Sequence, residues 1–137
     1  MNKTQIKLCE KIYDKNKSSY KKVKMMAFLF KGKKLLNTGI NSDKTDPVQS
    51  KYRKHIIDND IFIDKRHAEV DCLKSFSNKS DSNLKDLTLW IISKRSDGTF
   101  RDSKPCKVCR QIIDKMKVGE ICYYHKGRLV SEKLIKN

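Results

Sequence analysis

Apolar and polar positions change their spacing several times along the chain, and each change marks a new element. Residues 3–17 carry apolar side chains three and four positions apart among charged neighbours, which predicts an amphipathic helix that covers one face of a sheet. The nearly continuous apolar run 23–30 and the shorter run 34–40 are separated by Lys31-Gly32-Lys33. Two strand-like runs around a short break with a glycine predict a β-hairpin.

The middle of the chain alternates between loop and regular element. Residues 41–60 are polar and contain Asp46-Pro47, so we expect a long loop with at most one helical turn. Residues 66–78 repeat apolar side chains at three- and four-residue intervals, which predicts a second helix. Residues 87–92 are rich in strand-forming side chains and precede a Ser-Asp-Gly turn, which predicts a third strand.

The last third of the chain supplies a helix and a second hairpin. Pro105 stands where the first residue of a helix would be, and an apolar stripe continues from there until Gly119. Residues 120–125 and 128–134 flank Lys126-Gly127, which is typical of two antiparallel strands joined by a tight turn. The predicted order is α-β-β-α-β-α-β-β, an α/β fold in which helices cover a mixed sheet.

The 137 residues have the size of one compact domain, and 37% of them are hydrophobic, enough for one ordinary core. We therefore expect a single domain over residues 1–137, with its core in about residues 20–135. No run approaches the ~18 to 20 apolar residues of a membrane span, and no apolar signal segment follows the first residues. We expect an intracellular, cytoplasmic protein with no membrane partner.

Charge changes this picture only slightly. The chain has 32 basic and 16 acidic residues, a formal net charge of +16. Such a positive field attracts phosphates and suggests a nucleotide or nucleic-acid partner. Most of the basic residues are lysines, however, and a solvated Lys-rich surface explains the excess equally well.

The number and spacing of the cysteines favour metal binding over disulfide bonds. Their odd number, five, and the expected intracellular location argue against a disulfide framework. Cys9, Cys72 and Cys122 stand alone, and we expect them to be small buried apolar residues. Cys106 and Cys109 instead form a Cys-x-x-Cys pair.

Two motifs at the starts of predicted helices carry the candidate chemistry: His67-Ala68-Glu69 and Pro105-Cys106-Lys107-Val108-Cys109. A hydrolytic zinc site takes three protein ligands and leaves a fourth position to water. His67, Cys106 and Cys109 supply that number, and a helix start and the metal both favour thiolates. We predict that these residues hold one Zn²⁺ per chain.

Glu69 is the predicted general acid and base of this site. Zinc lowers the pKa of a bound water from ~15.7 toward ~7. Glu69, two residues after the histidine, would take the proton of that water and later deliver it to the leaving group. Each motif also has a structural explanation, as a helix cap, a redox pair or half of a structural zinc site. His55, Cys72 or His125 could complete such a structural site, which would leave Glu69 without a role.

Taken together, His67-Ala68-Glu69 and Pro105-Cys106-x-x-Cys109 resemble the cytidine and deoxycytidylate deaminase superfamily, whose zinc enzymes remove the exocyclic amine of a nucleobase. The resemblance covers roughly residues 20–135. It implies a three-layer fold with a mixed five-stranded sheet and a hydrolase reaction, with cytosine as the expected base. The short terminal hairpin around Gly127 resembles the group whose fourth and fifth strands are antiparallel.

The resemblance also implies substrate contacts. Gly39-Ile40-Asn41 resembles the Gly-x-Asn of many members, in which the asparagine contacts the sugar; a turn-capping role for Asn41 is the structural alternative. The backbone amide of Ala68 and the backbone carbonyls of Ser103 and Lys104 are implied to hold the edge of the base. The residues before the proline and the position of the glutamate match neither the polynucleotide-editing branch nor the free-nucleoside branch cleanly.

For the substrate we favour a nucleotide-metabolism enzyme that acts on cytidine, CMP or dCMP, and the resemblance implies that it forms a homo-oligomer. Lys44, Arg53 and Lys54, in the loop after Asn41, could neutralise a 5′-phosphate, although a solvated loop would contain such residues too.

Two alternatives stay open. The first is nucleic-acid editing, in which cytosine or adenine is deaminated in single-stranded DNA or RNA. Aromatic side chains could then stack bases; the candidates are Tyr20, Tyr52, Phe100, Tyr123 and Tyr124. The second is a non-catalytic, zinc-stabilised nucleic-acid-binding protein, against which the intact Glu69 argues.

Overall fold

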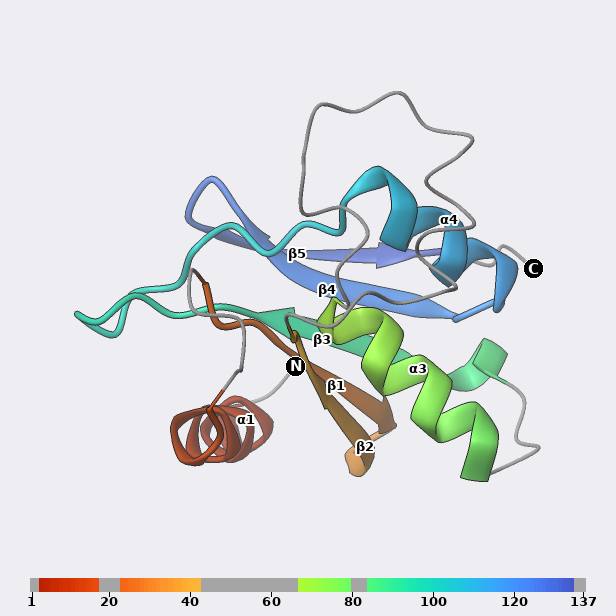
Figure 1. The fold of residues 1–137 in the computed structure, drawn as a ribbon, viewed down its shortest axis with the longest axis horizontal. Coiled ribbons are helices and arrows are strands. Elements are labelled where there is room, and N and C mark those ends of the chain that lie inside the picture. Colours follow the sequence, from red (N-terminus) through yellow and green to blue (C-terminus); the bar gives the residue numbers. More distant parts are fainter. Residues whose placement is uncertain (1–2, 18–22, 43–66, 80–83, 135–137) are drawn as a thin grey trace.

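The computed structural model describes residues 3–17, 23–42, 67–79 and 84–134, and within them the elements follow the predicted order (Figure 1). The helices are α1 (Lys3–Lys15), α3 (Ala68–Lys79) and α4 (Lys107–Lys115), and a short 3-10 turn, η1, spans Leu84–Asp86. The strands are β1 (Met26–Lys31), β2 (Lys34–Ile40), β3 (Thr88–Ile92), β4 (Glu120–His125) and β5 (Arg128–Lys133).

The strands form one mixed five-stranded sheet in the order β2-β1-β3-β4-β5. β1 is antiparallel to β2 and to β3, β3 is parallel to β4, and β4 is antiparallel to β5. The antiparallel β4–β5 pair confirms the prediction for the fourth and fifth strands. α4 lies in the connection between the two parallel strands, as such a crossover requires.

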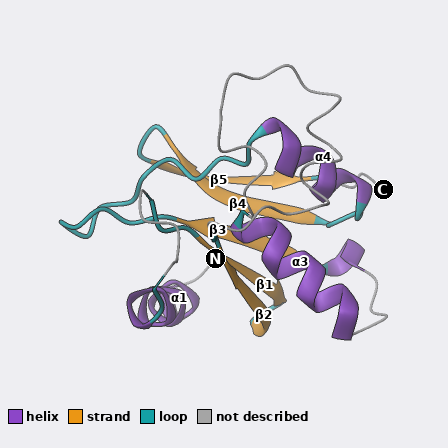
Figure 2. Cartoon of the chain, viewed as in Figure 1, coloured by secondary structure: helices purple, strands orange, loops and turns teal. Residues whose placement is uncertain are grey.

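The sheet is the middle layer of a three-layer α/β fold, as predicted (Figure 2). Residues 26–30 of β1 are all buried because helices cover both faces of the sheet. Ala27 and Leu29 face α3 and α4, whereas Met26, Phe28 and Phe30 face α1. We call these two sides the α3–α4 face and the α1 face.

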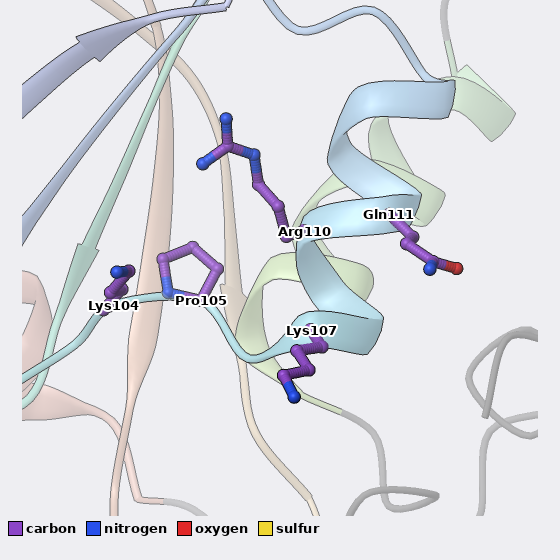
Figure 3. Close-up of a pocket in the computed structure, with 5 residues that line it drawn as sticks. All are labelled: Lys104, Pro105, Lys107, Arg110 and Gln111. Atoms are coloured by element: carbon purple, nitrogen blue, oxygen red, sulfur yellow. The ribbon is translucent and has the colours of Figure 1, made fainter. Parts of the chain in front are cut away.

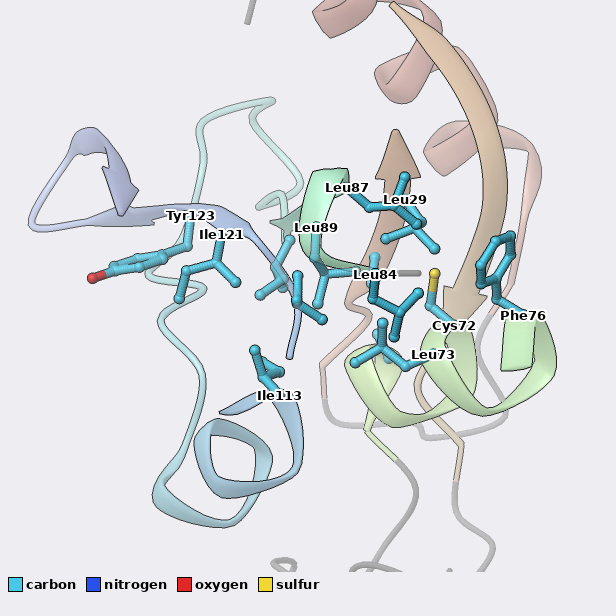
Figure 4. Packing of buried hydrophobic residues seen from close by; sticks show 14 residues of the cluster. Leu29, Cys72, Leu73, Phe76, Leu84, Leu87, Leu89, Ile113, Ile121 and Tyr123 are labelled. Carbon is cyan, nitrogen blue, oxygen red and sulfur yellow. The ribbon is translucent and has the colours of Figure 1, made fainter. Parts of the chain in front are cut away.

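On the α3–α4 face, aliphatic side chains of the strands pack against the two helices (Figure 4). Leu73 and Phe76 of α3 and Ile113 of α4 contribute from the helices, and Leu89 and Ile121 contribute from the sheet. This packing fixes both helices on the same side of the sheet.

On the α1 face, Cys9 and Tyr13 of the helix pack on the large side chains of the sheet. The Tyr13 hydroxyl donates to the carbonyl of Lys24 at 3.0 Å and accepts from the amide of Lys94 at 2.9 Å. Because its polar atom is bonded, this tyrosine can be buried to 3% exposure without an unpaired group. The three cysteines expected to be buried, Cys9, Cys72 and Cys122, are indeed at most 4% exposed.

The start of α4 differs from the prediction. The helix begins at Lys107, Cys106 is its N-cap, and Pro105 therefore precedes the helix instead of opening it. The Cys106 sulfur accepts a hydrogen bond from the amide of Cys109 at 3.4 Å, the contact that a serine or aspartate makes at ordinary N-caps.

The end of α4 also differs, because the helix stops at Lys115 and not near Gly119. Lys117 has a φ of 59°, a left-handed conformation that a helix cannot continue through. Most of the predicted loop 41–60 lies outside the described residues. No helix in the described parts of the chain is long and apolar enough to cross a membrane.

Candidate metal centre and active site

The first candidate ligand, His67, is placed by the start of α3. Its backbone carbonyl accepts from the amide of Asp71 at 3.1 Å, so His67 is the residue from which the helix begins. α3 lies very close to β2, because an ideal Cβ built on Gly39 would be 2.5 Å from the carbonyl oxygen of Ala68 and 2.7 Å from Cα of Cys72. Glycine at this position therefore sets the distance between helix and strand.

Hydrogen bonds between side chain and backbone hold α3 in this position. Asp71 Oδ2 accepts from the amide of Ile40 at 3.0 Å. Asn37 Nδ2 donates to the carbonyl of Cys72 at 2.9 Å and to Ser75 Oγ at 2.8 Å. The Asp71 bond holds the first turn of α3, next to His67 and Glu69, against β2, and the Asn37 bonds hold the following turn.

The other two candidate ligands are placed by α4. Cys106 is the N-cap and Cys109 lies in the first turn, so the two sulfurs share the start of the helix. Cys109 is fully buried, with Val70 of α3 and Ile112 of α4 in the same small cluster. The contact between the two helices therefore brings both cysteines to His67.

The ligand-type atoms of His67, Cys106 and Cys109 all lie within 4.8 Å of one another. His67 Nδ1 is 3.1 Å from Cys109 Sγ and 3.5 Å from Cys106 Sγ. Zinc binds nitrogen at about 2.0–2.1 Å and sulfur at about 2.3 Å, which places two ligand atoms on one ion ~3–4 Å apart. The donor set and its spacing therefore fit a zinc ion.

The pKa values of the two thiols move in opposite directions. A hydrogen bond with the side chain of Cys109, joined by the hydrogen bond and charge of His67, lowers the pKa of Cys106 to about 4. Burial is the main reason that the pKa of Cys109 stands well above its usual value. The pair therefore keeps one thiol proton at neutral pH, and a cation that replaced this proton would let both sulfurs bind as thiolates.

Glu69 lies beside these ligands and is 2% exposed. Its Oε1 is buried and has no hydrogen-bond partner within the described part of the chain. Burial raises the pKa of Glu69, and the next influences on that pKa are the charges of His67 and Cys106. A buried carboxylate oxygen without a partner costs stability, and the vacant partner position next to a metal site suits a water or a substrate group.

A fourth protein ligand is not found in the described residues. The group of potential ligands at the site comprises His67, Cys106 and Cys109 and includes neither Cys72 nor His125. His55 lies outside the described residues. The observed group therefore agrees with three protein ligands and an open fourth position, the arrangement of hydrolytic zinc sites.

Asn41 and Ser103, two of the predicted substrate residues, have their side chains bonded within the protein. Asn41 Oδ1 accepts from the amide of Met25 at 2.9 Å, and its Nδ2 donates to the carbonyl of Val23 at 2.6 Å. Ser103 Oγ donates to the carbonyl of Ile91 at 2.7 Å and accepts from the amide of Tyr124 at 3.0 Å. Both side chains thus fix backbone segments, and their contact with a substrate stays a prediction.

The remaining residues that were predicted to contact the substrate are buried, exposed or outside the described residues. Ala68 is fully buried at the start of α3, and the side chain of Lys104 is exposed. Lys44, Arg53 and Lys54 lie outside the described residues, as do Tyr20 and Tyr52. Phe100 and Tyr124 stack on each other, with ring centroids 4.2 Å apart, on the α1 face of the sheet.

Comparison with known proteins assigns the family. The family model of the cytidine and deoxycytidylate deaminase zinc-binding region matches residues 2–125. Because this match covers most of the chain, the protein belongs to the cytidine and deoxycytidylate deaminase family. Zinc is its cofactor, and His67, Cys106 and Cys109 are positioned to hold the ion. No curated protein matches the chain.

Two solved structures share the fold. A cytidine deaminase from Burkholderia pseudomallei superposes with a TM-score of 0.62 at 16% identity, covering 98% of this chain and 94% of the other. A dCMP deaminase from the cyanophage S-TIM5 superposes with a TM-score of 0.50 at 19% identity, covering 88% of this chain and 82% of the other. The family and the fold together define a zinc-dependent deaminase of the cytidine or deoxycytidylate type.

The sequence motifs predicted the candidate site but not the residues that position it. The sequence analysis used Gly39 only as part of the Gly-x-Asn motif. A glycine inside a strand is also a known sign that another backbone approaches closely, and this signal could have predicted the contact with α3. Asp71 and Asn37 have no local signal at all, because each bonds to an element distant in the sequence.

Proposed function

We propose that the protein hydrolyses the exocyclic amine of cytosine in a nucleoside or nucleotide of the CMP or dCMP type. Water supplies the oxygen that replaces the amine at C4, and the products are the uracil compound and ammonia. One observation carries the proposal: His67, Cys106 and Cys109 converge within 4.8 Å beside the buried Glu69, whose Oε1 lacks a partner.

Zinc held by His67, Cys106 and Cys109 would supply a water of lowered pKa at neutral pH. Glu69 would accept one proton from the attacking water and deliver it to the ring nitrogen, and it would then carry the remaining proton of the added hydroxyl to the departing amine. The raised pKa of Glu69, caused by burial, suits this role, because a group that both accepts and returns a proton works best when its pKa is near the working pH.

Substrate binding is proposed at backbone groups at the start of α3 and just before the start of α4. The amide of Ala68 and the carbonyls of Ser103 and Lys104 would hold the edge of the base, and Asn41 would contact the sugar. The bonds from Ser103 to β3 and β4 support this role, since they immobilise the segment whose carbonyls would face the base. Lys44, Arg53 and Lys54 stay predicted phosphate contacts.

Two structural neighbours, which are named a cytidine deaminase and a dCMP deaminase, support a small substrate. We therefore propose a monomeric cytosine substrate in preference to a polynucleotide. We also propose that residues 1–137 form one domain, that the protein acts inside the cell, and that it assembles into a homo-oligomer.

An assay of the zinc-loaded protein with cytidine, dCMP and a single-stranded cytosine-containing oligonucleotide tests the proposal. We expect ammonia from the monomers and not from the oligonucleotide. Glu69→Gln should lower kcat by about 10²- to 10⁴-fold, because it removes the proton carrier, while the zinc content stays at one ion per chain. Uracil formed only in the oligonucleotide would favour editing, and no product from any substrate would favour a binding protein. Loss of zinc from Glu69→Gln would show that Glu69 is a ligand.

A further inference from the structure

The outer side of α1 carries a row of lysines. Four exposed lysines stand four residues apart along the helix: Lys3, Lys7, Lys11 and Lys15. Residues at this spacing are neighbours on a helix surface, and the row is about 18 Å long at 1.5 Å per residue. With 3.6 residues per turn, the middle of the row lies roughly opposite Cys9 and Tyr13, which pack on the sheet. The row therefore faces solvent.

The turn between β1 and β2 adds to this positive charge. Three further lysines are exposed there: Lys31, Lys33 and Lys34. Gln5 Nε2 donates to the carbonyl of Gly32 at 3.1 Å, and this bond holds the turn beside the first part of α1. We call the four lysines of the helix and the three of the turn the α1 lysine patch.

The fold leaves the charge of this patch uncompensated. The two acidic residues of α1, Glu10 and Asp14, both lie near Lys94 Nζ, at 3.8 and 3.2 Å. Within the described residues no lysine of the patch forms an ion pair. Like charges four residues apart weaken a helix, as does a cation in its first turn, where Lys3 lies. A row that weakens its own helix is expected where a ligand uses it.

A second basic surface is smaller and partly neutralised. A groove of about 330 Å³ at the start of α4 has three cations in its lining, Lys104, Lys107 and Arg110 (Figure 3). Arg110 is bonded to Glu132, with an Nη2–Oε1 distance of 2.8 Å, and to Asp114, with an Nε–Oδ1 distance of 3.2 Å. The α1 lysine patch is therefore the better candidate for an extended anionic partner.

The patch and the candidate metal centre belong to opposite sides of the sheet. Figure 1 shows α1 on one side and, on the other, α3 and α4, whose starts carry the candidate zinc ligands. A partner bound along α1 therefore leaves the metal centre accessible.

The chemistry of the patch favours nucleic acid over other anionic partners. Protein interfaces need an apolar core and are depleted in lysine, whereas Leu8, 41% exposed, is the one exposed large apolar side chain of α1. A membrane-binding helix inserts its apolar face, but that face of α1 is packed on the sheet. A phosphate backbone requires only positive charge and hydrogen-bond donors, which ammonium groups supply.

Within nucleic acids, the patch suits a duplex better than a single strand. Proteins that hold single strands stack the bases on aromatic side chains. The one aromatic residue of α1, Tyr13, is 3% exposed and packs on the sheet. Contacts with the backbone alone carry no sequence information.

We propose that the α1 lysine patch binds the phosphate backbone of double-stranded nucleic acid without regard to sequence. The protein thereby holds a duplex at a surface separate from its metal centre. This interaction goes beyond the proposed deamination and does not depend on it.

The test measures the affinity of the zinc-loaded protein for a short mixed-sequence DNA duplex over a range of salt concentrations. The double variant Lys7→Gln/Lys11→Gln removes the middle of the row. We expect its dissociation constant at ~50 mM salt to be roughly tenfold higher or more. The slope of log affinity against log salt should become shallower by about 2, since each phosphate contact contributes about 0.9.

The matched control is Lys115→Gln/Lys133→Gln, which has the same net charge. Its two lysines are exposed on α4 and β5 and lie outside the patch. This control should bind nearly as the parent protein does, because salt screens distant charges. Lys7→Arg/Lys11→Arg should also retain affinity, because it keeps both charges. Thermal unfolding of Lys7→Gln/Lys11→Gln should show no loss of stability, since the change removes repulsion within the helix.

Four results would overturn the proposal. The first is equal duplex affinity of Lys7→Gln/Lys11→Gln and the parent protein, and the second is an equal loss in the Lys115→Gln/Lys133→Gln control. The third is a strong preference between two duplexes of unrelated sequence. The fourth is that the patch variant weakens binding only to a single strand, or only to vesicles of phosphatidylserine and phosphatidylcholine, which would assign a different partner.

An assay of dCMP deamination keeps this proposal distinct from the proposed function. Lys7→Gln/Lys11→Gln should deaminate as the parent protein does, and a fall in its activity would contradict a surface separate from the metal centre. If the parent protein deaminates nothing but binds the duplex through Lys7 and Lys11, the patch stands and the proposed function fails. If it deaminates dCMP and the patch variant binds the duplex unchanged, the patch fails alone.

Discussion

The two faces of the sheet are built from alternate residues of the same strands, but they use different side chains. The α1 face carries large residues, among them Phe28, Phe30 and Trp90, which fill the space under α1. The α3–α4 face has small residues where α3 packs, Gly39 and its pairing partner Ala27, and the backbone of Ala68 in α3 lies against Gly39. Large side chains hold a helix away from a sheet, whereas small ones let the backbones approach. Close approach places α3, with His67 and Glu69, at a fixed position.

Both sides of the sheet hold a buried polar atom without a partner among the described residues, but the groups differ in charge: Trp90 Nε1 on the α1 face belongs to a neutral indole, whereas Glu69 Oε1 belongs to a carboxyl group. On the α1 face, the Tyr13 hydroxyl is bonded to backbone atoms of Lys24 and Lys94. On the α3–α4 face, Glu69 Oε1 is buried with no partner among the described residues. Stability alone would favour a bonded or apolar group at this position. A cost in stability next to three candidate metal ligands is expected where function, not packing, determines the residue.

The strongest test of this difference replaces one buried cysteine on each face. Cys109→Ser removes a predicted ligand and should release zinc, and because zinc binding is coupled to folding, the free energy of unfolding should fall by about 4 kcal/mol or more. Zinc content by elemental analysis and denaturant unfolding measure both effects.

Cys122→Ser is the matched control, since Cys122 is 4% exposed on the α1 face and its sulfur is 3.2 Å from Ser131 Oγ. This variant should retain full zinc and lose only about 1–2 kcal/mol, the cost of a buried hydroxyl that has a partner. Equal zinc content in both variants would contradict the ligand assignment.

A second test closes the space that small residues leave between α3 and β2. In Gly39→Ala the new methyl group would meet the backbone of Ala68 and Cys72, which cannot move independently of the helix. We expect a loss of about 3 kcal/mol or more, at the upper end for overpacking, together with weaker zinc binding because the first turn of α3 shifts. Chelator competition measures the zinc affinity and urea unfolding measures the stability.

Asn37→Ala provides a graded comparison at the same interface. It removes the bonds from Asn37 to Cys72 and Ser75 without adding a clash, so a loss of about 1–2 kcal/mol and little change in zinc affinity are expected. If Gly39→Ala bound zinc as tightly as the parent protein, close approach would not be what positions His67.

The sequence predicted the parts of this arrangement that have a local signal. The periodicity of residues 3–17 and 66–78 identified helices, and the nearly continuous apolar run 23–30 identified a strand, which the structure shows to be buried on both faces. The candidate ligand set followed from residue type and spacing in two short motifs, because zinc accepts few side chains and geometry restricts their separation.

The remainder depends on contacts that no local pattern encodes. The start of α4 was misplaced because Pro105 resembled a first helical residue, whereas the thiol of Cys106 serves as the cap. The closeness of Gly39 to α3, and the pair between Arg110 and Glu132, join residues far apart in the chain. Only the assembled sheet brings such residues together.

The smallest predicted effect concerns the pair that ties α4 to the edge strand β5 on the α3–α4 face. The hydrogen bond from Arg110 is the main cause that lowers the pKa of Glu132. A carboxyl with a lowered pKa in the folded state stabilises the protein at pH above its unfolded pKa of about 4.3, and this contribution is lost as the pH falls through the folded pKa. Since both side chains are about one-third exposed (35% and 36%), solvent screening limits the contribution to ~1 kcal/mol or less.

Glu132→Gln removes the titrating group and isolates its share of the pH dependence. The difference in unfolding free energy between the parent protein and Glu132→Gln should therefore be largest near neutral pH and should shrink as the pH falls through the lowered folded pKa of Glu132, below which both carry a neutral group at this position. Denaturant unfolding over this pH range measures it, and taking the difference cancels shared changes such as release of zinc in acid. In the Arg110→Gln background the same substitution should have almost no pH-dependent effect. If the difference persisted there, the shift would come from charges other than Arg110, and α4 would not depend on this pair for its hold on β5.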